Sequence, residues 1–379
     1  MRFRVERDVL AEAVAWAARS LPARPPVPVL AGLMLSADTD AAGRLVLSSF
    51  DYEVSARVEI TADVTEPGVV LVSGRLLADI TRSLPARPVE VATDGAKVVV
   101  TCGSSRFTLL TLPVEDYPTL PEMPGASGSL RGDLFAAAVG QVSIAAGRDD
   151  TLPVLTGVRL EIEAEKITMA ATDRYRLAVR DLAWTPEQAG LSAIALVPAR
   201  TLADTAKSLA SADKVTVALA SGGTGEGLVG FEGSGRRTTS RLLDGEFPKY
   251  KSLLPAESAS VATVETAGLV ESVRRVALVA ERNTPIRLSF SGGEVTLEAG
   301  SGDEAQASES LDAGLAGDDI SIAFNPAYLL DGLGVLDAAY AELRFTASTR
   351  PAVIAGKDSA DAVAGDDYRY LLMPVRLSG

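Results

Sequence analysis

The most informative residue type in this chain is one that it lacks, because none of its 379 residues is a histidine. That absence excludes His-ligated metal sites and Ser-His-Asp or Cys-His nucleophilic machinery, and it removes the commonest general base. Cys102 is the single cysteine, so an intramolecular disulfide and a thiolate metal cluster are excluded as well. We therefore expect no metal site and no cofactor.

Long apolar runs are also missing. No stretch is long enough to span a bilayer, and the charged start, residues 1–8, has no apolar core of a secretory signal. Hydrophobic residues make up 47% of the chain and charged residues 23%, which is typical of a globular protein. One cysteine fits a reducing compartment, so we expect a cytoplasmic protein.

Two short segments recur three times along the chain. The first contains a proline before a strand-like run, and the second ends in an aspartate after an N-terminal helix signal. The prolines are Pro28, Pro153 and Pro285, and the aspartates are Asp79, Asp204 and Asp331. Proline and aspartate are 51, 51 and 46 residues apart, and successive aspartates are 125 and 127 residues apart. This agreement predicts three homologous units of about 125 residues.

Each unit alternates helical and strand patterns. Residues 45–50 and 54–60 alternate as half-buried strands do. One apolar face at helical spacing in the first unit is formed by Val9, Leu10, Ala13, Val14, Ala17 and Leu21. A second helix is expected after the N-terminal helix signals Ser73, Pro198 and Asn325-Pro326. We predict an α+β protein whose domains each pack two helices on antiparallel β-sheets. The predicted domains are residues 1–122, 127–255 and 259–379.

Four segments carry a resemblance to a known family. They are Ser-Gly-Arg-Leu-Leu-Ala-Asp (73–79), Ala-Thr-Asp-Arg-Tyr-Arg-Leu (171–177), Glu-Phe-Pro-Lys-Tyr (246–250) and Met-Pro-Val-Arg-Leu (373–377). With the repeat, they resemble the bacterial DNA polymerase III beta sliding clamp family over the whole chain. The arginine- and alanine-rich composition favours an actinobacterial-like member. The resemblance implies the DNA clamp fold and a head-to-tail ring of two chains, with helices around a central hole.

The charge distribution fits this expectation better than the net charge does. The total is −14, which by itself argues against a nucleic-acid partner. The formal charges of the six predicted helical segments nevertheless sum to +5, so the rest of the chain carries −19. These segments are residues 2–24, 73–88, 131–148, 198–214, 265–287 and 326–340. The resemblance implies sequence-independent contact with duplex DNA. The expected DNA-facing residues are Arg24, Arg75, Arg148 and Arg200. The alternative is that these arginines are merely solvated.

The resemblance also implies a peptide-binding groove between the second and third domains, where partner proteins insert short linear motifs. Aliphatic walls and a methionine would give an adaptable apolar pocket. The matching residues are Leu155, Thr172, Tyr175, Arg176, Leu177, Pro248, Leu253, Asn325, Tyr328, Met373, Pro374 and Val375. The alternative for Leu177 and Leu253 is an ordinary core position. Ser252 replaces a basic residue common in the family, which leaves the peptide preference open.

A third implied surface joins two chains through an apolar centre with charges at its rim. The matching residues are Arg106, Phe107, Leu278, Val279, Asp303 and Glu304. The alternative is a strand pair and a helix end with no partner.

We therefore interpret the chain as a non-enzymatic, homodimeric processivity factor. The expected partners are duplex DNA, the replicative polymerase subunit, repair polymerases and a separate ATP-driven clamp loader. The sequence leaves open whether this is the housekeeping clamp or a second copy that confers resistance to a peptide antibiotic bound in the groove. The alternative function is a carboxylate-based hydrolase on a repeated β-rich scaffold.

Two further motifs are interpreted as structural. Gly225-Glu-Gly-Leu-Val-Gly230 matches a dinucleotide-binding pattern, but a strand-like run follows it, so a hairpin is expected. The acidic pairs Asp149-Asp150, Asp318-Asp319 and Asp366-Asp367 lie between predicted elements. They are expected to be turns rather than Mg²⁺ sites.

Overall fold

The computed structural model describes residues 1–39, 43–219, 227–280, 284–300 and 305–376. Two α-helices occur in each repeat. They are α1 (Arg7–Ala17), α2 (Gly74–Ser83), α3 (Gly132–Ser143), α4 (Ala199–Ser208), α5 (Thr266–Val276) and α6 (Pro326–Gly334). The described residues also form short 3-10 helices, η1 (Ala18–Ser20), η2 (Pro28–Ala31), η3 (Pro153–Thr156), η4 (Tyr250–Leu253) and η5 (Ala277–Val279). In the described part of the chain, no helix is long and apolar enough to cross a membrane.

The chain forms two compact units, and each holds one continuous antiparallel sheet. The first unit comprises residues 1–135, 185–188 and 204–242. The order of its strands is β14 (Thr185–Pro186), β10 (Ala126–Leu130), β16 (Val215–Leu219), β17 (Leu228–Gly233), β18 (Arg236–Arg241), β4 (Val54–Thr61), β3 (Arg44–Phe50), β2 (Gly32–Asp38), β6 (Gly68–Ser73), β9 (Ser105–Leu112), β8 (Lys97–Cys102), β7 (Val89–Asp94), β1 (Arg2–Val5) and β5 (Asp63–Glu66).

The second unit comprises residues 136–184, 189–203 and 243–379. The order of its strands is β15 (Ser192–Pro198), β11 (Gly157–Glu163), β12 (Lys166–Thr172), β13 (Arg176–Ala183), β26 (Tyr368–Leu372), β25 (Ala352–Lys357), β24 (Tyr340–Phe345), β19 (Ser260–Glu265), β22 (Ala307–Ala316), β21 (Glu294–Ala299), β20 (Ile286–Ser291) and β23 (Ile320–Phe324). Helices combined with antiparallel sheets over three repeats confirm the predicted α+β class.

Each sheet crosses a boundary between repeats. In the first unit, β18 of the second repeat pairs with β4 of the first, from Arg236 opposite Val58 to Ser240 opposite Val54. In the second unit, β26 of the third repeat pairs with β13 of the second, in the register Arg176–Leu372. The second repeat therefore gives strands to both sheets, and sheet continuity defines the compact units.

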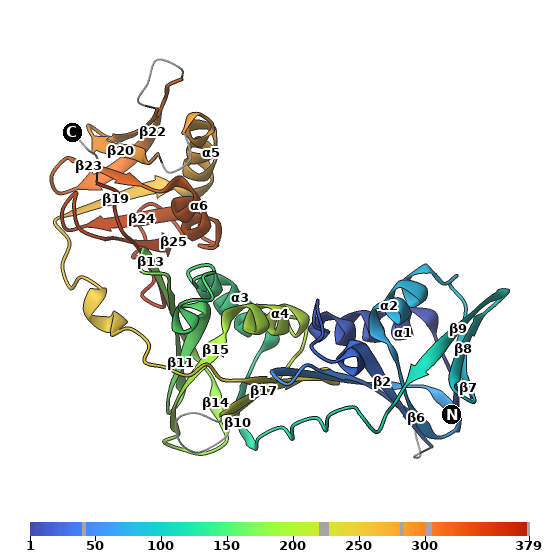
Figure 1. Cartoon of the computed structure of the whole chain (residues 1–379). Helices are drawn as coiled ribbons and strands as arrows, with labels where there is room; N and C mark the ends of the chain where they lie inside the picture. Colours follow the sequence, from blue (N-terminus) through green and yellow to red (C-terminus); the bar gives the residue numbers. More distant parts are fainter. Residues whose placement is uncertain (40–42, 220–226, 281–283, 301–304, 377–379) are drawn as a thin grey trace. The chain divides into compact units, whose positions relative to one another are not determined.

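Helices α1 and α2 lie side by side over one face of the first sheet (Figure 1). Of the face predicted from helical spacing, Val9 is 42% exposed in the first turn of α1, and Leu21 is buried just beyond the helix. The other four predicted residues, Leu10, Ala13, Val14 and Ala17, are buried on α1. They join one hydrophobic core with residues of strands β1 to β9, for example the fully buried Leu45. The 3.6-residue period thus placed the buried side of the helix correctly.

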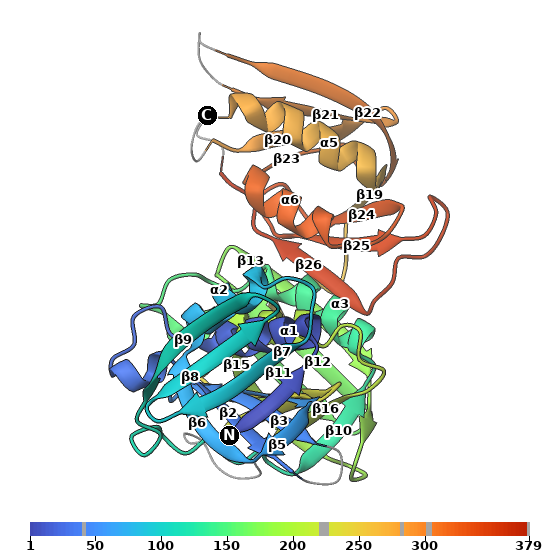
Figure 2. The same ribbon diagram turned by 90° about the vertical axis from the view of Figure 1, so that its right-hand side faces the viewer.

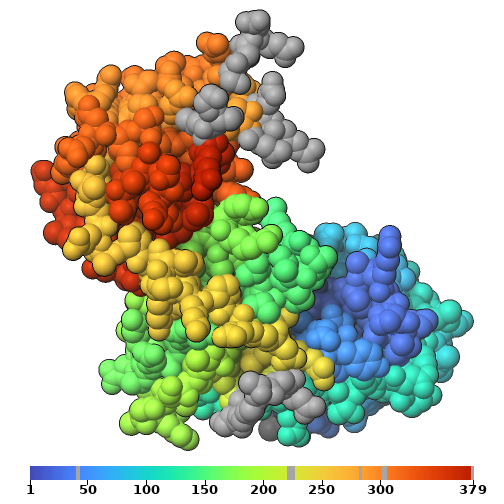
Figure 3. Space-filling model, turned by 60° about the vertical axis from the view of Figure 1, so that its left-hand side comes forward, coloured from blue at the N-terminus to red at the C-terminus, as the bar shows by residue number. Residues whose placement is uncertain are grey.

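In the second unit, α5 and α6 lie next to each other across the strands of the third repeat (Figure 2). Leu269, Val273 and Val276 form the buried face of α5. The connector before this repeat, residues 243–259, lies on the outside of the unit (yellow in Figure 3). It is fastened there because Phe247 and Tyr250 are buried in a small hydrophobic core with residues of β13 and β26.

Helix α5 is tied to β22 by a polar network at the edge of its buried face, where Ser272 is buried and Arg275 is exposed. Glu309 of β22 accepts hydrogen bonds from Ser272 Oγ at 2.6 Å and from Arg275 Nε at 3.0 Å. Together, the hydrogen bonds from Arg275 and Ser272 lower the pKa of Glu309 to about 2. Because the carboxylate is stabilised in the folded chain, its contribution to stability is present above the ordinary pKa of glutamate and is lost as pH falls toward 2.

We predict that Glu309→Gln lowers the free energy of unfolding at pH 7 and that its difference from the wild type shrinks between about pH 4.5 and pH 2. Urea denaturation followed by circular dichroism at several pH values measures this. Glu298→Gln, at an exposed position on β21, is the matched control and should not reproduce this pH dependence. A difference that stays constant with pH would contradict the role assigned to the carboxylate.

Candidate functional site

The turn between β12 and β13 is built by Asp173. Its Oδ1 accepts hydrogen bonds from the backbone N–H groups of Tyr175 and Arg176, at 3.0 and 3.1 Å. Such a side-chain-capped turn tolerates a left-handed residue, and Arg174 has φ 81°. The first repeat forms the same turn, with Asp51 as the acceptor. The turn thus belongs to the repeat, and what differs is the side chains that it presents.

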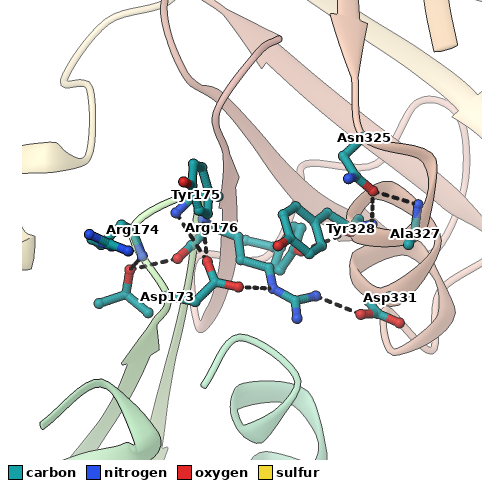
Figure 4. A network of polar contacts seen from close by, with 10 residues as sticks. Asp173, Arg174, Tyr175, Arg176, Asn325, Ala327, Tyr328 and Asp331 are labelled. Atoms are coloured by element: carbon teal, nitrogen blue, oxygen red, sulfur yellow. Dashed lines mark hydrogen bonds and ion pairs between the residues drawn. The ribbon is translucent and has the colours of Figure 1, made fainter. Parts of the chain in front are cut away.

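Arg176, the first residue of β13, is a buried cation with only 5% of its side chain exposed. Its Nε contacts Asp173 Oδ2 at 2.9 Å, and its Nη1 contacts Asp331 Oδ2 on α6 at 2.5 Å. Its guanidinium carbon lies 4.3 Å from the centre of the Tyr328 ring. Burial acts to lower the pKa of Arg176, but hydrogen bonding to Asp331 and the neighbouring Tyr370 and Asp173 raise it on balance. The guanidinium therefore stays charged and links β13 to α6 (Figure 4).

Helix α6 is held in place at its start and along its buried side. Asn325 caps it, since its side-chain oxygen accepts hydrogen bonds from the N–H groups of Ala327 and Tyr328. The fully buried Tyr370 of β26 donates its hydroxyl proton to the Tyr328 carbonyl at 2.8 Å. The Tyr370 ring approaches so closely that a Cβ at Gly332 would lie 2.3 Å from it. Only glycine permits this packing.

An exposed aromatic and apolar surface lies over this buried frame. The rings of Tyr175 and Tyr328 stack with their centres 6.3 Å apart, and 55% of Tyr175 is exposed. The N–H of Met373 donates to the Tyr175 carbonyl at 2.9 Å, and 39% of Met373 is exposed. We call Tyr175, Tyr328 and Met373 the tyrosine–methionine surface. It can contact an apolar ligand while its backbone groups stay satisfied.

The other predicted groove residues divide into exposed and buried positions. Pro248 and Leu253 are exposed on the connector, and Leu155, Pro374 and Val375 are half-buried. Thr172 and Leu177 are buried. Thr172 donates its hydroxyl proton to the Arg176 carbonyl, and Leu177 belongs to the small core beneath the connector. Asn325 and Arg176 turn their polar groups toward α6 and its neighbours rather than outward.

Sequence reasoning missed three residues of this site. Asp173, Asp331 and Tyr370 were not predicted to belong to it, although they hold Arg176 and α6 in place. A signal for Asp331 was present, because it is the third of the repeated aspartates. In contrast, nothing in the sequence pattern connects Asp331 with Arg176, which lies 155 residues away.

The four arginines expected to face DNA are all exposed. Arg75 and Arg200 lie in the first turns of α2 and α4, while Arg24 and Arg148 follow α1 and α3 along the chain. Arg75 also donates to the Pro22 carbonyl at 3.1 Å, which holds its side chain beside the segment that contains Arg24.

The residues expected to join two chains lie on a strand and a short helix. Arg106 and Phe107 are exposed on β9, and Leu110 of the same strand is 72% exposed. Within the described residues, Ser105–Leu110 pair with β8, and only the end of β9 pairs with β6. Leu278 on η5 is 85% exposed, and Val279 is half-buried. Asp303 and Glu304 lie outside the described residues.

The motifs interpreted as structural lie in turns or strands where they are described. Asp149 Oδ1 accepts hydrogen bonds from the N–H and the hydroxyl of Thr151, which is a turn. Gly230 lies in β17, and Gly225 is outside the described residues. The described part of the chain holds no cluster of three or more metal-ligating side chains.

Three family models match successive parts of the chain. They describe the N-terminal, central and C-terminal domains of the DNA polymerase III beta subunit, at residues 1–121, 129–249 and 251–376. The chain belongs to this family of bacterial sliding clamps. The family predicted from the sequence is confirmed, and the clamp interpretation is favoured over the carboxylate hydrolase.

Individual relatives agree over the full length. The chain is 66% identical to the beta sliding clamp of Streptomyces coelicolor over all of both chains. It is 50% identical to the beta sliding clamp homolog GriR of Streptomyces muensis, with 99% of each chain covered. A crystal structure of a Pseudomonas aeruginosa sliding clamp bound to griselimycin matches with a TM-score of 0.90 at 29% identity, covering all of both chains.

We predict that Tyr370→Phe lowers the free energy of unfolding by about 1 kcal/mol. The ring and its packing on Gly332 remain, but the buried hydrogen bond to the Tyr328 carbonyl is lost. Urea denaturation at neutral pH measures the change. Tyr52→Phe, at a 48% exposed position, is the control and should be nearly neutral. Equal stabilities for Tyr370→Phe and the wild type would show that this hydrogen bond does not hold α6.

Proposed function

We propose that the chain is a DNA sliding clamp: two copies close into a ring around duplex DNA and tether the replicative polymerase to it. The observation that carries this proposal is the match of three successive family domains to a chain built from three copies of one helix–sheet unit. We place the domains at residues 1–122, 127–255 and 259–379. The ring acts by topology, since a closed ring cannot leave the duplex sideways and keeps its partner at a high local concentration.

DNA would be held weakly by arginines on the helices and on the segments that follow them. Arg24, Arg75, Arg148 and Arg200 are exposed, which supports this assignment. Four phosphate contacts per chain would confer no sequence preference and only moderate affinity at physiological salt. Weak contact suits a protein that must slide. The acidic remainder of the chain would limit non-specific adhesion.

Partner proteins would bind through short linear peptides at the tyrosine–methionine surface and the predicted groove residues around it. Exposed apolar side chains with a few fixed polar groups are the usual composition of a peptide site. The expected partners are the replicative polymerase subunit, repair polymerases and the clamp loader. The groove would also be the target of a peptide antibiotic, which is supported by the existence of a Pseudomonas aeruginosa clamp structure bound to griselimycin.

The protein would catalyse no reaction and act in the cytoplasm, where chromosome replication takes place in bacteria.

The decisive experiment compares retention on nicked circular and linear DNA after loading by the cognate clamp loader with ATP. We expect the protein to stay on circles during gel filtration at moderate salt and to be lost from linear molecules, whose free ends let a ring slide off. Linearising the circles afterwards should release it. Equal retention on both DNAs, falling steeply with salt, would instead indicate ordinary electrostatic binding and overturn the proposal.

Dimer formation is proposed between Arg106 and Phe107 on β9 of one chain and Leu278, Val279, Asp303 and Glu304 of its partner. Two observations support it. Exposed Phe107 and Leu110 lie on a stretch of β9 that pairs, among the described residues, with β8 alone. Leu278 is an 85% exposed leucine on a one-turn helix. Unpaired strand edges and exposed apolar side chains are ordinarily covered by a partner.

We predict that Leu278→Glu converts the dimer into a monomer. Burying a carboxylate in an apolar interface is costly, so the dissociation constant should rise by two orders of magnitude or more. Light scattering coupled to gel filtration should give about twice 39.4 kDa for the wild type and 39.4 kDa for the variant. The matched control is Val363→Glu, at a 93% exposed apolar position, which should remain dimeric. A dimeric Leu278→Glu would remove this residue from the interface.

A further inference from the structure

The repeated aspartates are used differently in the first and third copies. Asp79 is 72% exposed on α2, and its contact with Arg82 of the same helix is 3.8 Å long. Asp331, at the same repeat position on α6, instead reaches the hairpin of the neighbouring repeat and contacts Arg176 at 2.5 Å. The residue of the first copy that corresponds to Arg176 is Val54, which cannot form an ion pair. The repeat fold therefore does not require the Arg176–Asp331 pair.

Arg176 needs both of its carboxylate partners. A guanidinium with 5% exposure is costly unless its charge is compensated. Asp173 lies in the same hairpin and holds Nε, so it cannot by itself connect the hairpin to α6. Asp331, 44% exposed, supplies the charged connection to the helix. Figure 4 shows the guanidinium between the two carboxylates, with Asp331 on the side of α6.

The same helix turn carries the aromatic part of the tyrosine–methionine surface. Tyr328 and Asp331 are three residues apart on α6, so they lie on the same side of the helix. The Tyr328 ring covers the Arg176 guanidinium at 4.3 Å and stacks against Tyr175 at 6.3 Å. Fixing Asp331 to Arg176 therefore fixes the position of the Tyr328 ring against Tyr175. Without that contact, the hydrogen bond from Tyr370 to the Tyr328 carbonyl and the Asn325 cap would still hold the helix in place. The side of α6 that carries the Tyr328 ring would then be free to turn relative to Tyr175.

We propose that Asp331 is a positioning residue of the peptide-binding site: by holding Arg176, it sets the geometry of Tyr175 and Tyr328 without being a principal peptide contact. The proposal rests on the proposed peptide-binding function of this surface. The same ion pairs limit which peptides can bind, because the Arg176 guanidinium is already paired with Asp173 and Asp331. The surface should recognise a peptide mainly through apolar side chains rather than through a carboxylate paired with Arg176.

The test is a titration of full-length protein variants with a fluorescein-labelled peptide, read by anisotropy. The peptide spans the clamp-binding linear motif of the organism's own replicative polymerase subunit. Asp331→Ala should weaken binding by about tenfold, as expected when one partner of a partly buried charge pair is removed. Asp331→Glu should recover most of the affinity. Asp79→Ala, the matched change at the same repeat position, should bind like the wild type.

A double-mutant cycle separates positioning from a general loss of structure. Arg176→Ala and Asp331→Ala should not be additive, so the double variant should bind about as weakly as the weaker single variant. Light scattering coupled to gel filtration should still give about twice 39.4 kDa for Asp331→Ala, which shows that the ring itself is intact. If Asp331→Ala folds poorly, Asp331→Asn keeps the shape, removes the charge and should show the same direction of change.

Two outcomes would overturn the inference. Peptide affinity of Asp331→Ala and Asp331→Asn within twofold of the wild type would show that the pair does not control the site. Additive losses in the double-mutant cycle would show that Arg176 and Asp331 act independently. In contrast, a wild-type protein that fails to bind the peptide would overturn the proposed peptide site itself, and the positioning role with it.

Discussion

The pairing of β26 with β13 is the interaction on which the candidate site depends. It joins the third repeat to the second in one sheet, with Leu372 opposite Arg176. The hydrogen bond from Met373 to the Tyr175 carbonyl continues the contact beyond the strand end. The same strand carries Tyr370, which packs under α6 and bonds to it. One strand therefore places Arg176, α6 and Met373 within reach of each other, and side-chain contacts then complete the site.

The two boundaries between repeats use the same positions with different chemistry. At the first, Arg236 lies 5.8 Å from the Trp16 ring and donates to the Ser208 carbonyl. At the second boundary, Tyr368 corresponds to Arg236, Gln141 to Trp16 and Val335 to Ser208. Gln141 donates to the Val335 carbonyl, and Tyr368 donates to the Gln141 carbonyl. The backbone geometry of the repeat is thus retained, whereas the side chains at each boundary have diverged. Such divergence allows one boundary to carry a binding surface that the other lacks.

Much of the architecture could be predicted from local pattern. The helical face of α1 was correct at Leu10, Ala13, Val14 and Ala17, because an apolar period of 3.6 residues places side chains along one side of a helix and not along one face of a strand. It was wrong at Val9, which is exposed in the first turn of the helix. The N-terminal signal at Asn325 was also correct, and the structure shows its side chain capping α6. The site was less predictable. Its members came from a family resemblance, and the structure places Leu177 in the core and turns Arg176 inward. Burial depends on neighbours far along the chain, which a local pattern does not contain.

The sequence by itself determined the three-fold repeat, the helix–sheet class and the family, because each of these follows from the spacing and order of motifs along the chain. Only the tertiary structure decided that two compact units form with a sheet that crosses a repeat boundary in each, since strand pairing across repeats joins residues more than a hundred positions apart. It also decided that the repeated aspartate has a new role in the third copy. Asp331 meets Arg176 because β26 brings α6 to the hairpin, and an ion pair needs proximity in space rather than in sequence.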